Sequence, residues 1–167
     1  NMRSKVYAII GLGDEQKSDL DEMIDLAGKR GDLKDQVSTY SNLARYYTRI
    51  HDLGNTKIVI DNAIKILKNI DHPFGEITIN SKLGQWYYAQ NNFDDALDCF
   101  IKCKDQAIII GDDRGLSVAL TNCGLVYQAL GNQSEALQHY NNSLQIDQAS
   151  GNLKSEAMTL GNIGKLY

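Results

Sequence analysis

The side chains best suited to chemistry are three cysteines and a run of carboxylates in the middle of the chain. Cys99 and Cys103 lie four residues apart, a spacing that places two thiolate metal ligands on one helix face. No histidine lies near them in the pattern, and Cys123 makes the cysteine count odd, so neither a metal site nor a disulfide framework is expected. Asp94 and Asp95 imitate paired catalytic carboxylates, but they open a predicted helix, where negative charge is favoured. We therefore interpret the thiols as buried and reduced and the carboxylates as solvated.

Two further patterns resemble cofactor or catalytic motifs but lack the necessary context. Gly11-Leu12-Gly13 has neither the preceding strand nor the third glycine of a phosphate-binding loop. The histidines His51, His72 and His139 fall in predicted turns or on an outer helix face, away from any nucleophile pattern. The sequence thus predicts no enzymatic activity, no cofactor and no metal.

Composition narrows the class of protein and of partner. The 167 residues are 43% hydrophobic and 23% charged, as in a soluble folded domain, and a single proline, Pro73, suits a mostly helical chain. The net charge of −4 predicts no nucleic-acid partner. No apolar run approaches the roughly 20 residues of a membrane span, so no membrane association is expected. Reduced thiols favour a cytoplasmic location, and we expect the chain to be a fragment of a longer protein.

An internal repeat shows which elements position these side chains. A segment that begins at Gly111 begins again at Gly151, so the period is 151 − 111 = 40 residues. Small residues recur on this period, each followed three places later by a tyrosine. The small residues are Ala44, Gly84, Gly124 and Gly164, and the tyrosines are Tyr47, Tyr87, Tyr127 and Tyr167, with Tyr7 one period earlier. A period of this size predicts a stack of similar helical units.

The repeated residues resemble the tetratricopeptide repeat. Leu83-Gly84-x-x-Tyr87 and Ile163-Gly164-x-x-Tyr167 match its L-G-x-x-Y core, and Ala96 and Ala136 occupy its small-residue position in the second helix. The usual repeat has about 34 residues, so this longer unit is more similar to the variant in kinesin light chains, Pins-type adaptors and bacterial peptide-sensing regulators. Two positions differ from the family pattern: the position that often holds Trp has other residues here, and the closing Pro is missing.

The predicted fold is all-α: a right-handed superhelical solenoid of antiparallel helix pairs with about nine helices. We expect one array over 1–167, with a partial repeat at 1–30, full repeats at 31–70, 71–110 and 111–150, and a partial repeat at 151–167. The helices are expected at 2–12, 15–30, 33–51, 55–70, 74–90, 93–110, 113–130, 133–149 and 153–167.

Local signals support these boundaries and raise one question about packing. Asn92 and Asn132 are expected to cap the second helices of their repeats. A glycine within a helix costs about 1 kcal/mol relative to alanine. The recurring Gly84, Gly124 and Gly164 therefore predict the close approach of a neighbouring helix backbone.

The resemblance also implies where a ligand binds, because the first helices of such repeats line a concave groove. Asn42, Asn122 and Asn162 stand two places before the small residue, where related repeats contact bound peptide. An asparagine amide both donates and accepts hydrogen bonds, so it can pair with a peptide backbone in either direction. The alternative is that these amides bond only to a neighbouring helix.

Charged and apolar residues complete the expected site. Arg45, Arg49 and Lys82 make part of the groove basic and favour an acidic segment as ligand. The remaining candidates are Gln85, Tyr88, Leu125 and Lys165. The sequence predicts a non-catalytic scaffold that captures an extended protein or peptide segment, as the interaction or sensory arm of a larger regulatory protein. The alternative is a structural module that forms homo-oligomers through its groove or open ends.

Overall fold

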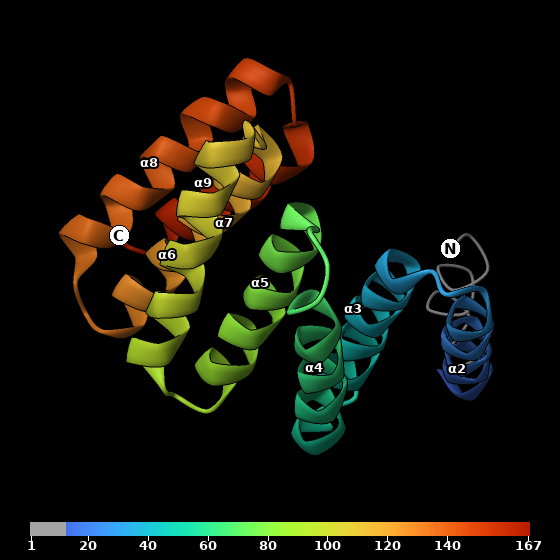
Figure 1. Ribbon diagram of the computed structural model, residues 1–167. Coiled ribbons are helices and arrows are strands. Elements are labelled where there is room, and N and C mark those ends of the chain that lie inside the picture. The colour runs from blue at the N-terminus through green and yellow to red at the C-terminus, as the bar shows by residue number, and fades with distance from the viewer. Residues whose placement is uncertain (1–12) are drawn as a thin grey trace. The chain divides into compact units, whose positions relative to one another are not determined.

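The computed structural model describes residues 13–167, and every regular element in this range is an α-helix (Figure 1). The expected first helix at 2–12, with Tyr7, lies outside the described residues. The helices are α2 (Gly13–Arg30), α3 (Leu33–Arg49), α4 (Leu53–Leu67), α5 (Pro73–Ala89), α6 (Phe93–Ile110), α7 (Asp113–Ala129), α8 (Gln133–Ser150) and α9 (Leu153–Gly164). Each lies within three residues of the bounds expected from the sequence.

The chain forms two compact units, Asn1–Lys82 and Leu83–Tyr167, which we call the N-terminal part and the C-terminal part. The division falls inside α5. In the N-terminal part, α3 packs on α2 and α4. In the C-terminal part, α7 packs on α6 and α8, and α9 packs on both α8 and α7. The helices α3 and α4 thus form one packed pair, and α7 and α8 form another.

Side-chain caps begin several of these helices. The carboxylates of Asp32, Asp52 and Asp112 accept hydrogen bonds from backbone amides three residues later, at 2.9–3.0 Å. Asn92 and Asn132 occupy the N-cap positions of α6 and α8 as expected, but neither side chain accepts a capping hydrogen bond from the described residues. The Asn92 amide donates instead to the Asp95 carboxylate, at 2.5 Å.

Residues with a left-handed backbone conformation follow several helices and form the tight turns between them. Gly31, Gly111 and Gly151, which follow α2, α6 and α8, have φ of +70°, +69° and +67°. Glycine accepts this conformation without a steric penalty. The turn between the two helices of a repeat also needs one positive φ, which recurs at 40-residue spacing. It is supplied by His51, Asn91 and Gly131.

The glycines inside helices are explained by aromatic rings and not by a neighbouring backbone. A Cβ added at Gly84 would lie 2.6 Å from the Phe100 ring, and one added at Gly124 would lie 2.5 Å from the Tyr140 ring. Both rings come from the second helix of the same repeat and are fully or almost fully buried. The same explanation fails for Gly164, which has no such neighbour within 4 Å among the described residues.

A polar layer joins α7, α8 and α9 where most earlier repeats have apolar residues. The Ser117 hydroxyl donates to the Asp147 carboxyl group at 2.6 Å, and Ser143 lies 3.0 Å from Ser117. Thr121 links Ser143, at 2.8 Å, to Thr159, at 3.4 Å. Asp147 is 1% exposed, although Ala107 and Leu67 stand at the equivalent positions 40 and 80 residues earlier.

Candidate functional site

The N-terminal part carries a cationic face on α3 and α5. Asn42, Arg45 and Arg49 lie three and four residues apart on α3, a spacing that places them along one side of the helix. Arg45 and Arg49 are exposed, whereas Asn42 is half-buried. The Arg49 guanidinium lies 5.8 Å from the centre of the Tyr46 ring, which holds it against the helix surface.

Lys82 of α5 belongs to the same face. Its side chain is half-buried, and loss of solvent around the ammonium group lowers the pKa of Lys82 to about 8. The positive charge of Arg45 lowers this pKa further. The structure therefore brings together two of the cations that the sequence predicts for a basic site.

In the C-terminal part, Asn122 of α7 differs from an ordinary structural amide. Its side chain is 9% exposed, and its Nδ2 atom is buried without a hydrogen-bond partner among the described residues. A buried donor without an acceptor costs about 1–3 kcal/mol. Asn162 is half-buried on α9, which packs on α7. The predicted alternative, an amide that bonds a neighbouring helix, does not describe the Nδ2 of Asn122.

The other candidates differ in their surroundings. Tyr88 is half-buried and packs edge-to-face on Phe93, with ring centres 5.5 Å apart, next to the core formed by Phe100 and Val126. Leu125 is half-buried on α7, and Lys165 is exposed just after α9. Gln85 is half-buried on α5. The structure thus makes Tyr88 part of the core packing as well as a candidate contact.

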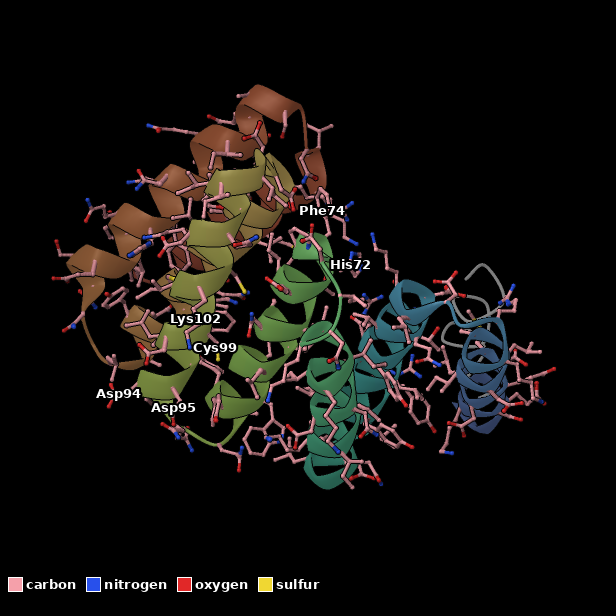
Figure 2. The ribbon with its side chains drawn as sticks, viewed as in Figure 1. His72, Phe74, Asp94, Asp95, Cys99 and Lys102 are labelled. Atoms are coloured by element: carbon pink, nitrogen blue, oxygen red, sulfur yellow. The ribbon has the colours of Figure 1, made fainter. Side chains whose placement is uncertain are left out.

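The carboxylates Asp94 and Asp95 are exposed and the three thiols are buried, as expected from the sequence. Asp94 and Asp95 occupy the first turn of α6, and Cys99 lies one turn further along the same helix (Figure 2). Burial raises the pKa of Cys99 and of Cys123 to about 11 and that of Cys103 to about 12, so these thiols are protonated and unreactive at neutral pH. Among residues 13–167, no three His, Cys, Asp or Glu side chains converge to hold a metal ion.

His139 is more deeply packed than its assignment to an outer helix face implies. Its imidazole stacks on the Tyr127 ring, with centres 5.2 Å apart, and its Nδ1 is buried without a partner in the described part of the chain. Burial, and to a lesser extent the charge of Lys104, lowers the pKa of His139. The imidazole is therefore neutral at pH 7 and acts as a packing group.

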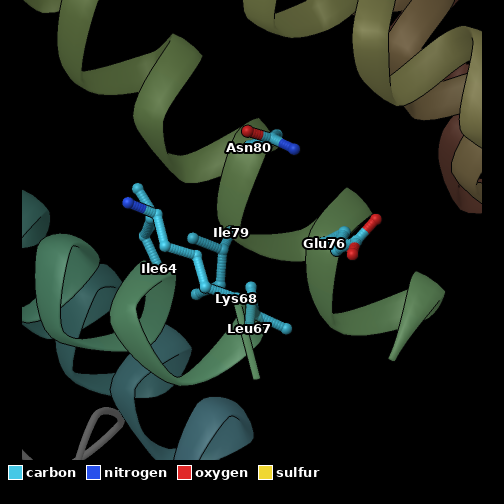
Figure 3. Close-up of a pocket in the computed structure, with 6 residues that line it drawn as sticks. All are labelled: Ile64, Leu67, Lys68, Glu76, Ile79 and Asn80. Atoms are coloured by element: carbon cyan, nitrogen blue, oxygen red, sulfur yellow. The ribbon is translucent and has the colours of Figure 1, made fainter. Parts of the chain in front are cut away.

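Sequence reasoning missed a cavity of about 200 Å³ between α4 and α5 (Figure 3). Its lining combines aliphatic, charged and amide side chains, namely Ile64, Leu67, Lys68, Glu76, Ile79 and Asn80. The 40-residue register contains a signal that could have revealed it. Where the cavity has Glu76 and Asn80, the next repeat has Leu116 and Leu120.

Comparison with known proteins agrees with the helix-pair architecture. Residues 75–149 match the family model of the tetratricopeptide repeat. A comparison with curated protein sequences finds no significant match. None of the helices described in residues 13–167 has the length and apolarity needed to cross a membrane.

Solved structures share the fold at low sequence identity. A STAND protein with a tetratricopeptide repeat sensor, from Pyrococcus horikoshii, is 20% identical with a TM-score of 0.82 over 99% of this chain. BtubC from P. vanneervenii is 16% identical with a TM-score of 0.78 over 93% of this chain. A Podosopora anserina kinesin light chain with nearly identical TPR-like repeats is 15% identical with a TM-score of 0.74 over 99% of this chain. The chain spans 25%, 65% and 82% of these three structures.

These findings confirm the predicted fold class, a solenoid of antiparallel helix pairs, and the resemblance on which it was based. The similarity to the tetratricopeptide repeat family model lies in residues 75–149.

Proposed function

We propose that this chain is a non-catalytic binding module that captures an extended protein or peptide segment containing acidic residues. The observation that carries the proposal is the pair Arg45 and Lys82. Two like charges close together, one of them partly desolvated, are stabilised when an anion binds between them. A carboxylate on an extended ligand supplies that anion and gains charge-assisted hydrogen bonds.

Asn122 supports the same proposal from the C-terminal part. Its unpaired Nδ2 gains a hydrogen bond when a ligand carbonyl reaches it, which offsets the cost of leaving that donor buried. Because the atom is covered in the free protein, binding requires the amide to rotate toward its exposed edge. Backbone capture by an amide and orientation by cations need no chemical step.

One of the comparisons supports a role within a larger protein. The repeats of the Pyrococcus horikoshii protein are described as a sensor, and this chain spans a quarter of that protein. We infer that the present chain serves in the same way, as the interaction or sensory arm of a regulatory protein in the cytoplasm. Its partners are then proteins or peptides, not nucleic acids or membranes.

The test is capture from an immobilised random peptide library, with bound sequences compared between wild type and Arg45→Ala. We expect wild type to enrich peptides with Asp or Glu and Arg45→Ala to lose that enrichment. Lys65→Ala is the matched control, because Lys65 is an exposed cation on the second helix of the same repeat. Equal enrichment of acidic sequences by wild type and Arg45→Ala would contradict the proposal.

A second candidate function, self-assembly, is favoured by the exposed apolar surface of α9. Leu153, Met158 and Leu160 are 75%, 59% and 48% exposed. Leu153 and Leu160 are seven residues apart and therefore lie on one side of α9, where exposed apolar side chains favour association with another surface. Static light scattering over a concentration series distinguishes the two functions, because self-assembly predicts a mass that rises with concentration and is reduced by Leu160→Lys.

A further inference from the structure

We propose that the cavity between α4 and α5 binds a free aliphatic α-amino acid of about the size of leucine. The proposal rests on the juxtaposition of an aliphatic floor, Ile64, Leu67 and Ile79, with a carboxylate and an amide from α5 and an ammonium group from the end of α4. The site includes none of the residues assigned above to peptide capture, so it is independent of the proposed function.

The volume sets the size of the ligand. An apolar cavity of about 150 Å³ accommodates benzene, which has six heavy atoms. In proportion, this cavity of about 200 Å³ holds about eight heavy atoms. Leucine, isoleucine and methionine have about that many, whereas a dipeptide with an aliphatic side chain has considerably more. The space therefore favours a single amino acid over a peptide.

The polar side chains of the cavity determine which polar groups the ligand carries. Glu76 and Asn80 are four residues apart on α5, so their side chains neighbour each other along one face of the helix. The Glu76 carboxylate accepts hydrogen bonds from an α-ammonium group, and the Asn80 amide donates to an α-carboxylate. Ile79, only 1% exposed, lies between them in sequence and forms the apolar floor for the ligand side chain.

Lys68 is the residue that can pair with the ligand's carboxylate. In Figure 3 its side chain extends past Ile64, so its ammonium group and the Glu76 carboxylate lie on opposite sides of the aliphatic residues. Lys68 is exposed and follows directly after α4. A four-carbon side chain at such a position is free to change rotamer, so it can turn toward the α-carboxylate of a bound amino acid. The ammonium and carboxylate of the ligand thus each meet an opposite charge.

The repeat itself shows that the cavity is a local feature. Leu116 and Leu120 replace Glu76 and Asn80 in the following repeat, and Leu160 stands at the position of Asn80 in the one after. Leu120 is only 7% exposed, so a leucine at the position of Asn80 is packed inside the following repeat. The change Asn80→Leu therefore introduces a residue that the architecture already accommodates and that occupies the ligand's place.

The experiment is methyl NMR of the whole chain, titrated with L-leucine to tens of millimolar. We expect saturable shifts of the Ile64, Leu67 and Ile79 methyl groups with a Kd on the order of 1 mM, as for a ligand of this size. The matched probes are 4-methylpentanoate, which lacks the ammonium group, and isopentylamine, which lacks the carboxylate. Each should bind at least about tenfold more weakly, because each leaves one charged partner unused.

Variants localise the effect. Asn80→Leu should abolish the shifts, Glu76→Gln should weaken binding of leucine but not of 4-methylpentanoate, and Lys68→Met should weaken binding of leucine but not of isopentylamine. Lys65→Met, on the same helix outside the cavity, should bind leucine like wild type. Unchanged spectra at remote methyl groups show that each variant is folded. The proposal is overturned if leucine produces no shifts at these methyl groups, if Asn80→Leu retains them, or if both partial probes bind as tightly as leucine.

Discussion

At the scale of single residues, the recurring glycines show how one missing Cβ determines the packing of a helix pair. Tyr140 is fully buried against Gly124, and its hydroxyl donates to the Gln128 side chain at 2.8 Å. Bonded at one end and enclosed along its length, the ring cannot move aside. In the first full repeat the equivalent pair is Ala44 and Ile60, both fully buried. Where the glycine is replaced by the larger alanine, the aromatic ring is thus replaced by the smaller isoleucine side chain.

Gly124→Ala should therefore destabilise the fold by about 1–3 kcal/mol, as overpacking of a core does. The chain offers a matched control in Gly164→Ala, because no neighbour from residues 13–167 lies within 4 Å of the added Cβ. That variant should be neutral or slightly stabilising, since alanine favours the helix. Urea denaturation measures both, and equal stability of the two variants would exclude the proposed ring contact.

Lys82 predicts a pH dependence with a defined sign. Its pKa is about 8 in the folded chain and near 10.5 when unfolded, so the unfolded state binds more protons between these values. Stability should rise as pH increases from 8 to 10.5, and the contribution is lost as pH falls back through 8. In Lys82→Met this contribution should be absent. Parallel denaturation curves at pH 8 and pH 10 measure the difference, and an identical pH dependence in wild type and variant would argue against a desolvated Lys82.

At the scale of elements, the polar layer between α7, α8 and α9 leaves a buried carboxyl group incompletely hydrogen-bonded. Asp147 is almost fully buried, and its Oδ2 has no hydrogen-bond partner in the range that the structure describes. Ser117 supplies the hydrogen bond to Oδ1. A half-satisfied buried network is less stable than a well-packed apolar layer of the same volume.

Ser117→Ala should cost about 1–3 kcal/mol, because it removes a hydrogen bond from a buried carboxyl group. Replacing the layer with the residues of the preceding repeat should have the opposite effect. That variant carries Ser117→Ile, Ser143→Cys, Asp147→Ala and Thr159→Ala, and should be at least as stable as wild type. Thermal and urea denaturation compare the two, and a combined variant less stable than Ser117→Ala would refute this account of the layer.

The turns between paired helices provide a second test at this scale. His51 and Asn91 hold φ of +59° and +60°, where a side chain is strained, and Gly131 takes the same place in the third full repeat at +80°. His51→Gly should stabilise the chain by up to about 1 kcal/mol, since relief of strain exceeds the added entropy of the unfolded state. Gly131→Ala should destabilise it. Melting temperatures check both signs, and a loss of stability in His51→Gly would mean that the imidazole contributes more than the strain costs.

At the scale of the whole molecule, the 40-residue period was enough to predict the helix pairs, because one set of apolar positions recurs in every repeat. Details that depend on partners far apart in sequence were not predictable in the same way. Nothing in the spacing shows that a ring and not a backbone covers Gly124, or that Lys82 loses solvent beside Arg45. The cavity next to Asn80 and the polar layer at Asp147 can be detected in the repeat alignment. Asn80 aligns with leucines in the two later repeats, and Asp147 aligns with Ala107 and Leu67.

The candidate site was predictable as a list of positions but not as an energetic arrangement. The motif predicts Asn122 by its position alone, whereas the feature that distinguishes it from Asn42 and Asn162 is a buried donor without a partner among the described residues. That property depends on α7 packing between α6 and α8. Among the cations, too, the closeness of Arg45 and Lys82 follows from the packing of two helices and not from the sequence around either residue.

Proton uptake on binding tests the central claim most directly. At pH 8 about half of the Lys82 side chains are neutral, since the pKa is about 8, and a bound carboxylate makes them fully charged. Isothermal titration calorimetry of an acidic peptide from the library, in two buffers of different ionisation enthalpy, should show uptake of about half a proton per peptide bound. Lys82→Met should bind the peptide with no uptake. Binding without proton uptake in wild type, or equal uptake in Lys82→Met, would contradict capture of an acidic segment at Arg45 and Lys82.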